Sequence, residues 1–169
     1  MTKIRILRAA DASTFRNLRL EALRESPTSF ASSYEDEARL TPGEFVRRLA
    51  RTDESWVLGA FDPTNTIVGC VGWYRYRGRK ISHKSHIWGM YVIPAERGKG
   101  IGRALVNEAL TRARAQAGMT QIDLLVAAGN TAAASLYTSF GFERVAVYPR
   151  ALCVDGAYID EELFILRIA

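Results

Sequence analysis

The chain has 169 residues, of which 48% are hydrophobic and 24% charged, and its formal net charge is +5 at pH 7. A chain of this size buries roughly two-thirds of its unfolded surface in one domain, so it needs no stabilising disulfide or metal. The sequence shows neither a signal-peptide pattern nor an apolar stretch long enough to span a membrane. We therefore expect a single domain, residues 1–169, in the cytoplasm and without a membrane partner.

Cys70 and Cys153 lie far apart, each within an apolar segment, and neither belongs to a CxxC motif. Two buried free thiols in a reducing compartment are therefore expected rather than a disulfide. His83 and His86 are three residues apart, so on a continuous strand their rings point to opposite faces. This spacing makes a poor metal pair, and we expect no metal site.

The first quarter of the chain predicts a strand, a helix and a loop. Residues 3–8 alternate in polarity like a strand, and Asp11 or Ser13 can cap a helix that ends near Glu25. The polar residues 26–37 then predict a loop.

The remaining sequence predicts three helices and six strands. Thr41 and Glu44 have the spacing of a capping box, which starts a helix that runs to about Arg51. Gly118 and Gly141 are placed to end the two later helices. The predicted strands are residues 55–61, 66–76, 86–93, 121–127, 142–149 and 157–167, and the two later helices are residues 100–117 and 130–140.

The segment RYRGRKISHK, residues 75–84, is the densest basic run and predicts a hairpin tip around Gly78. It is either a solvated turn or a basic rim that attracts phosphate or nucleic acid. The neighbouring aromatic residues suit base stacking, but they equally suit an ordinary strand. Nucleic acid is therefore not the expected partner.

The segment PAERGKGIGRAL, residues 94–105, follows a predicted strand and opens a predicted helix. The first turn of a helix leaves backbone N–H groups unpaired and carries a partial positive charge, so it binds phosphate well. Gly98, Gly100 and Gly102 let a ligand approach the main chain, and the flanking cations add charge. A diphosphate is the natural fit, whereas a tight structural connection explains only one or two of the glycines.

The spacing of these glycines excludes the two commonest nucleotide motifs. A Rossmann fingerprint requires GxGxxG, but Arg103 stands where the third glycine would be. A P-loop requires GxxxxGK followed by Ser or Thr, and this segment has the wrong length and lacks that hydroxyl.

Residues 97–102 instead match the R/QxxGxG/A loop of the GNAT N-acetyltransferase superfamily, which the sequence resembles over about residues 83–143. The strand before the loop, and Asn130 with the segment LYTSFGFE after it, follow in the order of that superfamily. The resemblance implies an α/β (α+β) fold with a GNAT-type mixed, mostly antiparallel sheet. That sheet has six to seven strands, is splayed between strands 4 and 5, and is flanked by about four helices.

The resemblance also implies acetyl-CoA as the acetyl donor, bound in the cleft between the splayed strands. The glycine loop would hold its pyrophosphate, and the fourth strand, bulged near Met90, Tyr91 and Val92, would pair with its pantetheine arm. Asn130 would hydrogen-bond that arm, cap a helix, or do both. The implied cofactor-binding residues are Met90, Tyr91, Val92, Arg97, Gly98, Lys99, Gly100, Ile101, Gly102, Arg103, Asn130 and Tyr137.

Acetyl transfer to an amine needs a polarised thioester carbonyl, a base and an acid. Backbone N–H groups around Tyr91 and Val92, freed by a bulge, could polarise the carbonyl. The Tyr137 phenol could protonate the departing thiolate, and ordinary packing is its alternative role. His86, whose unperturbed pKa is about 6.5, is the candidate base, with a plain strand histidine as the alternative. Other candidates for the base are Glu35, Glu37, Asp160 and water.

The acceptor is expected between two segments, residues 26–37 and 148–162, that are both acidic and aromatic. Carboxylates attract an ammonium group and rings cover its apolar stem, so the pair of segments suits a cationic amine. Ordinary surface charges with buried tyrosines are the alternative. The candidate acceptor-binding residues are Phe30, Tyr34, Glu35, Glu37, Tyr148, Tyr158 and Asp160.

The sequence therefore predicts an N-acetyltransferase that moves an acetyl group from acetyl-CoA to a primary amine of a small molecule or peptide, by direct transfer in a ternary complex. The alternative is a non-catalytic module of the same fold that senses acyl-CoA or binds nucleic acid. The resemblance also allows a homodimer.

Overall fold

Seven strands form one mixed sheet in the computed structural model, which describes residues 2–50 and 52–168. The spatial order is β1-β2-β3-β4-β5-β7-β6, and every neighbouring pair is antiparallel except β4 and β5, which are parallel. The strands are β1 (Lys3–Ile6), β2 (Ser55–Phe61), β3 (Ile67–Arg75), β4 (Lys84–Val92), β5 (Gln121–Ala127), β6 (Glu143–Val154) and β7 (Ala157–Arg167).

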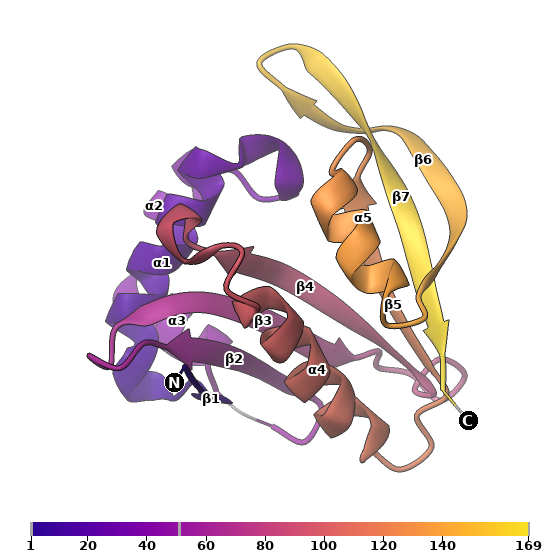
Figure 1. The fold of residues 1–169 in the computed structure, drawn as a ribbon, viewed down its shortest axis with the longest axis horizontal. Helices are drawn as coiled ribbons and strands as arrows, with labels where there is room; N and C mark the ends of the chain where they lie inside the picture. Colours follow the sequence, from indigo (N-terminus) through magenta and orange to yellow (C-terminus); the bar gives the residue numbers. More distant parts are fainter. Residues whose placement is uncertain (1, 51, 169) are drawn as a thin grey trace.

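Five α-helices flank the sheet within the described residues. They are α1 (Ala12–Glu25), α2 (Tyr34–Ala38), α3 (Pro42–Arg48), α4 (Ile101–Arg114) and α5 (Thr131–Thr138). Helices α4 and α5 lie over one face, whereas α1, α2 and α3 lie on the other side, beside β1 to β4 (Figure 1). None of the described helices is long and apolar enough to cross a membrane.

The sheet has two hydrophobic cores, one on each face. The larger contains Trp56 and Trp73, stacked with ring centroids 5.0 Å apart, together with the inner sides of α4 and α5. The smaller packs α1 and α3 against the sheet, with Phe15 and Phe45 edge to face at 6.2 Å. The two cores hold the helices against the sheet and so position the strands that border the cleft.

The parallel pairing of β4 with β5 is short. It covers Lys84 with Gln121, Ser85 with Ile122, and His86 with Asp123. Beyond these positions β4 continues to Val92 and β5 to Ala127, and the two strands diverge (Figure 1). The predicted splay between strands 4 and 5 is therefore confirmed.

A β-bulge interrupts β4 just beyond the point where the strands part. Trp88 pairs with Gly72 and Tyr91 pairs with Cys70, so two residues of β4, Gly89 and Met90, stand opposite one residue of β3. Gly89 has a φ of 63°, a conformation that glycine adopts without the steric cost of a side chain. The bulge expected near Met90, Tyr91 and Val92 is therefore present, at Gly89 and Met90.

Most predicted elements are confirmed, but the predicted loop 26–37 contains helix α2. The Ser33 hydroxyl accepts a hydrogen bond from the Asp36 N–H at 3.1 Å and so caps this short helix. The capping box of Thr41 and Glu44 is confirmed. Its helix ends at Arg48 rather than near Arg51, which lies outside the described residues.

Three local expectations are wrong. Asp11 precedes α1, yet its carboxylate does not cap the helix because it is bound by the Arg5 guanidinium at 2.7 and 2.8 Å. Strand β6 runs five residues further than predicted, to Val154, because a register shift between Tyr148 and Leu152 accommodates the interruption at Pro149. Cys153 is exposed rather than buried, since β6 is an edge strand.

Candidate functional site

The glycine loop presents a row of unpaired backbone donors. The first backbone bond of α4 runs from the Ala104 N–H to the Gly100 carbonyl. Among the described residues, the amides of residues 98–103 have no hydrogen-bond acceptor. Consecutive unpaired N–H groups at the start of a 14-residue helix are suited to bind an anion.

Gly98 and Gly100 keep this row open. Their φ angles of 76° and 79° lie in the left-handed region, and a Cβ added at either position would meet no atom within 4 Å. Glycine is therefore required by conformation, and the space beside it is available to a ligand. Gly102 differs, because a Cβ there would lie 3.1 Å from the Met90 methyl group. These residues fit a diphosphate laid against the main chain.

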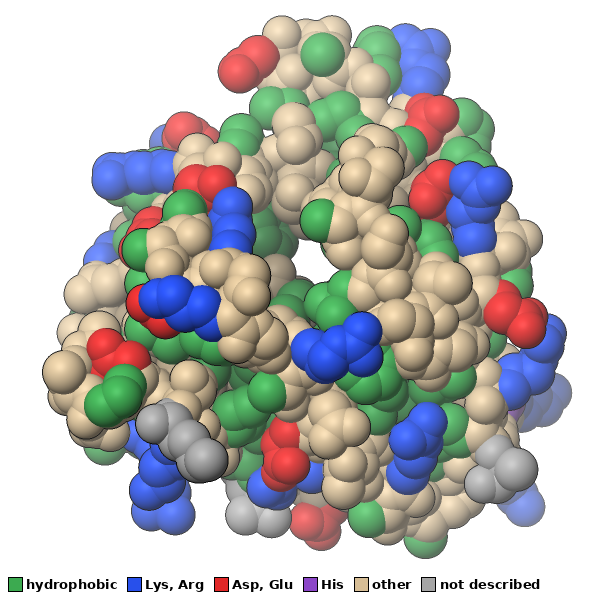
Figure 2. Space-filling view, viewed as in Figure 1, with side chains coloured by type: hydrophobic (Ala, Val, Ile, Leu, Met, Phe, Trp, Pro, Cys, Tyr) green, Lys and Arg blue, Asp and Glu red, His purple; other side chains and the backbone are tan. Residues whose placement is uncertain are grey.

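A groove of about 520 Å³ runs from this loop along the end of β4 to the start of α5. Figure 2 shows the molecule hollowed between its two halves, with basic side chains on the rim. The predicted cofactor residues that line the groove are Met90, Tyr91, Val92, Arg97, Gly98, Gly100, Ile101, Gly102, Arg103 and Asn130. Lining residues that the sequence did not assign to the cofactor are Ser26, Ser29, Phe30, Glu96, Ala132, Ala133 and Leu136.

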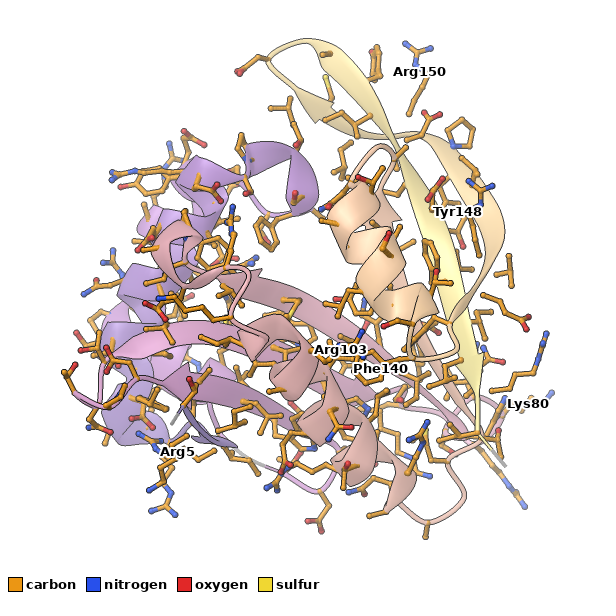
Figure 3. The ribbon with its side chains drawn as sticks, in the orientation of Figure 1. Arg5, Lys80, Arg103, Phe140, Tyr148 and Arg150 are labelled. Atoms are coloured by element: carbon orange, nitrogen blue, oxygen red, sulfur yellow. The ribbon has the colours of Figure 1, made fainter. Side chains whose placement is uncertain are left out.

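The three cations of the loop have different partners. Arg97 is bound by Glu25 at 2.7 and 3.1 Å, and this hydrogen-bonded pairing lowers the pKa of Glu25. Lys99 pairs with Glu96 at 2.8 Å and does not line the groove. Arg103 instead donates to the neutral Ser139 hydroxyl at 2.9 Å. Its guanidinium lies 5.2 Å from the Phe140 ring, between α4 and α5 (Figure 3). Among the described residues, Arg103 is the one of these three cations that pairs with no carboxylate.

One backbone amide of β4 is directed into the cleft. The Ile93 N–H donates to the Val68 carbonyl at 3.0 Å, so the backbone groups of Ile93 face β3. Because these groups alternate along a strand, those of Val92 face the cleft, where β5 offers no pairing. Arg97 Nε donates to the Val92 carbonyl at 2.9 Å, which agrees with this direction. The Tyr91 amide faces β3, so of the two expected donors only Val92 is suitably directed.

Asn130 and Tyr137 are seven residues apart, a spacing that would place them on one face of a continuous helix, but the structure does not place them so. Asn130 caps α5 from outside the helix, with its side-chain oxygen accepting from the Ala133 N–H at 3.1 Å. The residues of α5 that line the groove are Ala132, Ala133 and Leu136, whereas Tyr137 is 5% exposed and packs against Phe142. Burial raises the pKa of Tyr137, so its phenol keeps its proton at neutral pH.

His86 belongs to a polar cluster at the point where β4 and β5 part. Its Nδ1 lies 2.6 Å from an Asp123 carboxylate oxygen, and the Tyr76 hydroxyl donates to the same oxygen at 3.0 Å. The Tyr74 ring lies 5.3 Å from the imidazole. Sequence reasoning missed Asp123 and Tyr76, because only the pairing of β4 with β5 brings Asp123 beside His86.

A second cavity, of about 790 Å³, lies between residues 23–35 and residues 151–155 at the end of β6. Three candidate acceptor residues, Phe30, Tyr34 and Glu35, line it. Phe30 also lines the groove, so the two cavities meet at this ring. The exposed Cys153 lies in the wall formed by β6.

The other acceptor candidates lie elsewhere. Asp160 accepts a hydrogen bond from the Arg150 N–H at 2.7 Å, and Tyr158 lies against the Arg150 guanidinium on the β6–β7 hairpin. Tyr148 is an exposed residue of β6 (Figure 3). Glu37 is buried between Arg19 and Arg48, at 3.0 and 2.8 Å. Despite the opposing effect of burial, these arginines lower the pKa of Glu37, which makes it a poor base.

The basic segment 75–84 forms the predicted hairpin tip between β3 and β4. Arg75 donates to the backbone carbonyls of Ser82 and Ala117, and Arg77 pairs with Glu54 at 3.3 Å. Two of its cations therefore have structural partners. The described residues contain no cluster of three His, Cys, Asp or Glu side chains able to hold a metal ion.

Known proteins that resemble this chain in sequence and in structure are acetyltransferases. The sequence model of the acetyltransferase (GNAT) family matches residues 17–142. The chain belongs to the GNAT acetyltransferase family. This GNAT chain is 38% identical over 116 residues to the N-alpha-acetyltransferase RimI of Mycobacterium tuberculosis, covering 69% of each protein.

Solved structures confirm the GNAT fold. A GNAT acetyltransferase from Streptococcus pneumoniae superposes with a TM-score of 0.87 at 25% identity, over 99% of this chain and 100% of that one. A phosphinothricin acetyltransferase from Sinorhizobium meliloti, solved in complex with acetyl-CoA, has a TM-score of 0.83 at 20% identity, covering 99% and 89%. Acetyl-CoA is the acetyl donor of this family. The chain spans only 19% to 34% of the mycothiol acetyltransferases that it also matches.

Proposed function

We propose that this GNAT protein transfers the acetyl group of acetyl-CoA to a primary amine of a small molecule or peptide, directly within a ternary complex. The observation that carries the proposal is the row of unpaired amides of residues 98–103 at the mouth of a groove. Backbone donors in this number favour a diphosphate, which coenzyme A contains. Membership of the GNAT family supports acetyl as the group that is transferred.

The groove residues divide the binding between them. The loop amides and Arg103 would hold the pyrophosphate, while Asn130, with the end of β4, would hold the pantetheine arm. Acetyl-CoA supplies a thioester whose acetyl group is activated for attack by an amine. The Val92 N–H, directed into the cleft, would donate a hydrogen bond to an oxygen that becomes negative.

Proton movements would involve two side chains. His86 would take a proton from the amine, because an imidazole can accept a proton on its unprotonated ring nitrogen. Tyr137 would supply a proton to the departing sulfur; support for this role is its position next to the groove residue Leu136 and its retained phenolic proton. The Tyr137 ring also packs against Phe142, so this residue has a structural role beside the proposed one.

The acceptor would enter through the second cavity. Tyr34 and Glu35 suit an ammonium group, since a ring and a carboxylate both attract a cation. The meeting of this cavity with the groove at Phe30 supports direct transfer, because donor and acceptor then arrive by separate routes. The RimI relative, named an N-alpha-acetyltransferase, supports peptide N-termini as one acceptor class.

We further propose that one cytoplasmic domain carries the activity. A single sheet running from β1 to β7 supports one domain, and the free thiols of Cys70 and Cys153 suit a reducing compartment. A homodimer is supported by the exposed apolar residues Val145 and Val147 of the edge strand β6. Sedimentation of the purified chain measures the oligomeric state.

The test of the function combines binding with turnover. Acetyl-CoA should raise the Tm of the full chain, and free thiol should appear when a primary amine from a panel of diamines, amino acid amides and short peptides is added. Stabilisation without thiol release across the panel would favour the non-catalytic alternative. If neither acetyl-CoA nor coenzyme A raised the Tm, both the acetyltransferase and the acyl-CoA-sensing alternative would be refuted. Binding of nucleic acid that weakens with increasing salt would support the nucleic-acid-binding alternative, with the basic hairpin tip as the contact surface.

A further inference from the structure

The contact between His86 and Asp123 occupies a distinctive place in the sheet. These residues form the last paired position of β4 with β5, so their side chains lie where the cleft begins. Their contact distance of 2.6 Å is short for an N–H···O hydrogen bond, as expected where the acceptor is charged. The side chains are 16% and 9% exposed, which leaves His86 shielded from bulk water but not sealed.

Both side chains lie on the face of the sheet that α4 and α5 do not cover. Ile122 and Leu124 point into the core beneath those helices, so Asp123, between them in β5, points to the opposite face. The paired residue His86 shares that face. Glu161 of β7 pairs with Ala127 and lies on the same side by the same alternation.

The hydrogen bonds of Asp123 fix which imidazole nitrogen carries the proton. An ionised carboxylate can only accept hydrogen bonds, so the neighbouring Nδ1 must donate. The Tyr76 hydroxyl donates to the same oxygen and so restrains the carboxylate. When His86 is neutral, Nε2 therefore carries the lone pair. Among the described residues no protein group pairs with Nε2.

We propose that Asp123 and Tyr76 are positioning residues that hold His86 with Nε2 free to accept a proton from an acceptor ammonium group bound on this face. The inference rests on the proposed acetyl transfer and deepens it. In the step concerned, an N–H bond of the ammonium breaks, its electron pair stays on the amine nitrogen, and the proton forms an N–H bond with Nε2. The negative charge of Asp123 stabilises the resulting imidazolium.

The other ionisable groups around His86 agree with this role. Tyr74 and Tyr76 flank the ring, and burial raises the pKa of both phenols, so they remain neutral. Lys84 lies over the Tyr76 ring at 5.2 Å. Burial raises the pKa of Glu161, and a charged His86 partly offsets this. Asp123 is thus the acidic group in direct contact with the imidazole.

The same contact has a purely structural alternative, a clamp that joins the two halves of the sheet. Magnetic resonance tests, without any substrate, the imidazole tautomer that the proposal requires, and kinetics then separates the two roles. The chain contains two histidines, so selective ¹⁵N labelling gives two ring systems, with His83 as an internal reference. We expect neutral His86 in the form protonated at Nδ1, and a mixture of both forms after Asp123→Asn. Wild-type His86 protonated at Nε2 would overturn the proposal.

Kinetics with an active amine from the panel tests the consequence. General base catalysis contributes about 10²–10⁴-fold, so His86→Gln should lower kcat/KM by that order. Asp123→Asn should lower it by less and move the acid limb of its pH profile to lower pH, because the imidazolium loses its countercharge. In the His86→Gln background, Asp123→Asn should have no further effect. Additive losses, or an unmoved acid limb, would show a structural clamp only.

Asp11→Asn is the matched control, because it removes a carboxylate that pairs with Arg5 at 2.7 Å on β1, outside the groove. It should leave the pH profile unchanged. Tyr76→Phe keeps the negative charge of Asp123 and loosens only its orientation, so it should lower kcat/KM by less than Asp123→Asn. If the wild type releases no thiol with any amine, the proposed function fails, whereas the magnetic resonance result still decides the arrangement of His86.

Discussion

The Arg19 guanidinium lies 4.8 Å from the centroid of the Phe30 ring, and Glu37 holds the same guanidinium at 3.0 Å. Phe30 lines both the groove and the second cavity. A buried ion pair therefore supports the ring at which the proposed donor and acceptor routes meet.

Removing the charge of Glu37 should be costly. Glu37→Gln leaves Arg19, which is 5% exposed, without its counterion, and a broken buried pair typically costs about 3–5 kcal/mol. Urea unfolding measures the free energy. Asp11→Asn breaks a more exposed pair with Arg5 and should cost clearly less. Equal losses in the two variants would mean that the Glu37 pair has no special importance.

The same pair predicts a pH dependence of stability. Arg19 and Arg48 lower the pKa of Glu37 in the folded state against the opposing effect of burial. Its ionised form therefore stabilises the fold above the unfolded pKa of about 4.3, and this stability is lost as the pH falls through the lower, folded value. The difference in unfolding free energy between wild type and Glu37→Gln should be constant near pH 7 and shrink below about pH 4. A constant difference down to pH 3 would contradict this.

Gly100 of the glycine loop and Gly156 between β6 and β7 form a matched pair for substitution. Gly100 and Gly156 have φ angles of 79° and 80° with open space around them, so alanine strains both backbones similarly. Only Gly100 belongs to the groove. Calorimetry should show weaker binding of coenzyme A for Gly100→Ala and unchanged binding for Gly156→Ala, at similar losses of Tm. Equal affinities would place the diphosphate elsewhere.

Arg103 should matter more for binding than for stability. Its present partner is the neutral Ser139 hydroxyl, so its charge remains available to a phosphate. A hydrogen bond to a charged group contributes about 1.5–3 kcal/mol, so Arg103→Ala should raise the Kd for coenzyme A roughly 10- to 100-fold. Arg112→Ala, on the same helix but paired with Glu108, is the control and should leave the Kd unchanged. The reverse order of effects would count against the proposed cradle.

Tyr137→Phe distinguishes catalysis from packing. The substitution removes only the hydroxyl and keeps the ring against Phe142, so coenzyme A should bind as in the wild type. If the phenol is the acid, steady-state turnover should fall by about 10²–10⁴-fold, the usual contribution of such a group. Unchanged turnover would leave Tyr137 as a core residue.

The cofactor side of the site was largely predictable from the sequence, because it depends on local geometry. Gly98 and Gly100 indicate a left-handed backbone, and the helix that follows sets the direction of the loop's backbone N–H groups. Tyr137 shows the limit of this reasoning. Counting seven residues from Asn130 assumes that both residues lie within one helix, whereas Asn130 precedes α5 and Tyr137 is buried.

The acceptor side depends on contacts between distant segments and was less predictable. Asp123 lies 37 residues from His86, and nothing in its own neighbourhood marks it as a partner of that imidazole. Glu37 looks like a surface carboxylate in an acidic stretch, yet α1 supplies Arg19 to bury it. Cys153 looks apolar by composition, but the edge position of β6 exposes it.

The short pairing of β4 with β5 leaves two strand edges unpaired inside one molecule. Unpaired edges on a protein surface invite other chains to add a strand, which is why proteins usually cover or distort them. Here the two edges diverge inside the molecule, and the groove along the end of β4 is also lined by Phe30 and the glycine loop. A slender extended ligand can reach them, but another β-strand with its neighbours cannot. The protein thereby keeps backbone donors available for binding without exposing a surface that promotes aggregation.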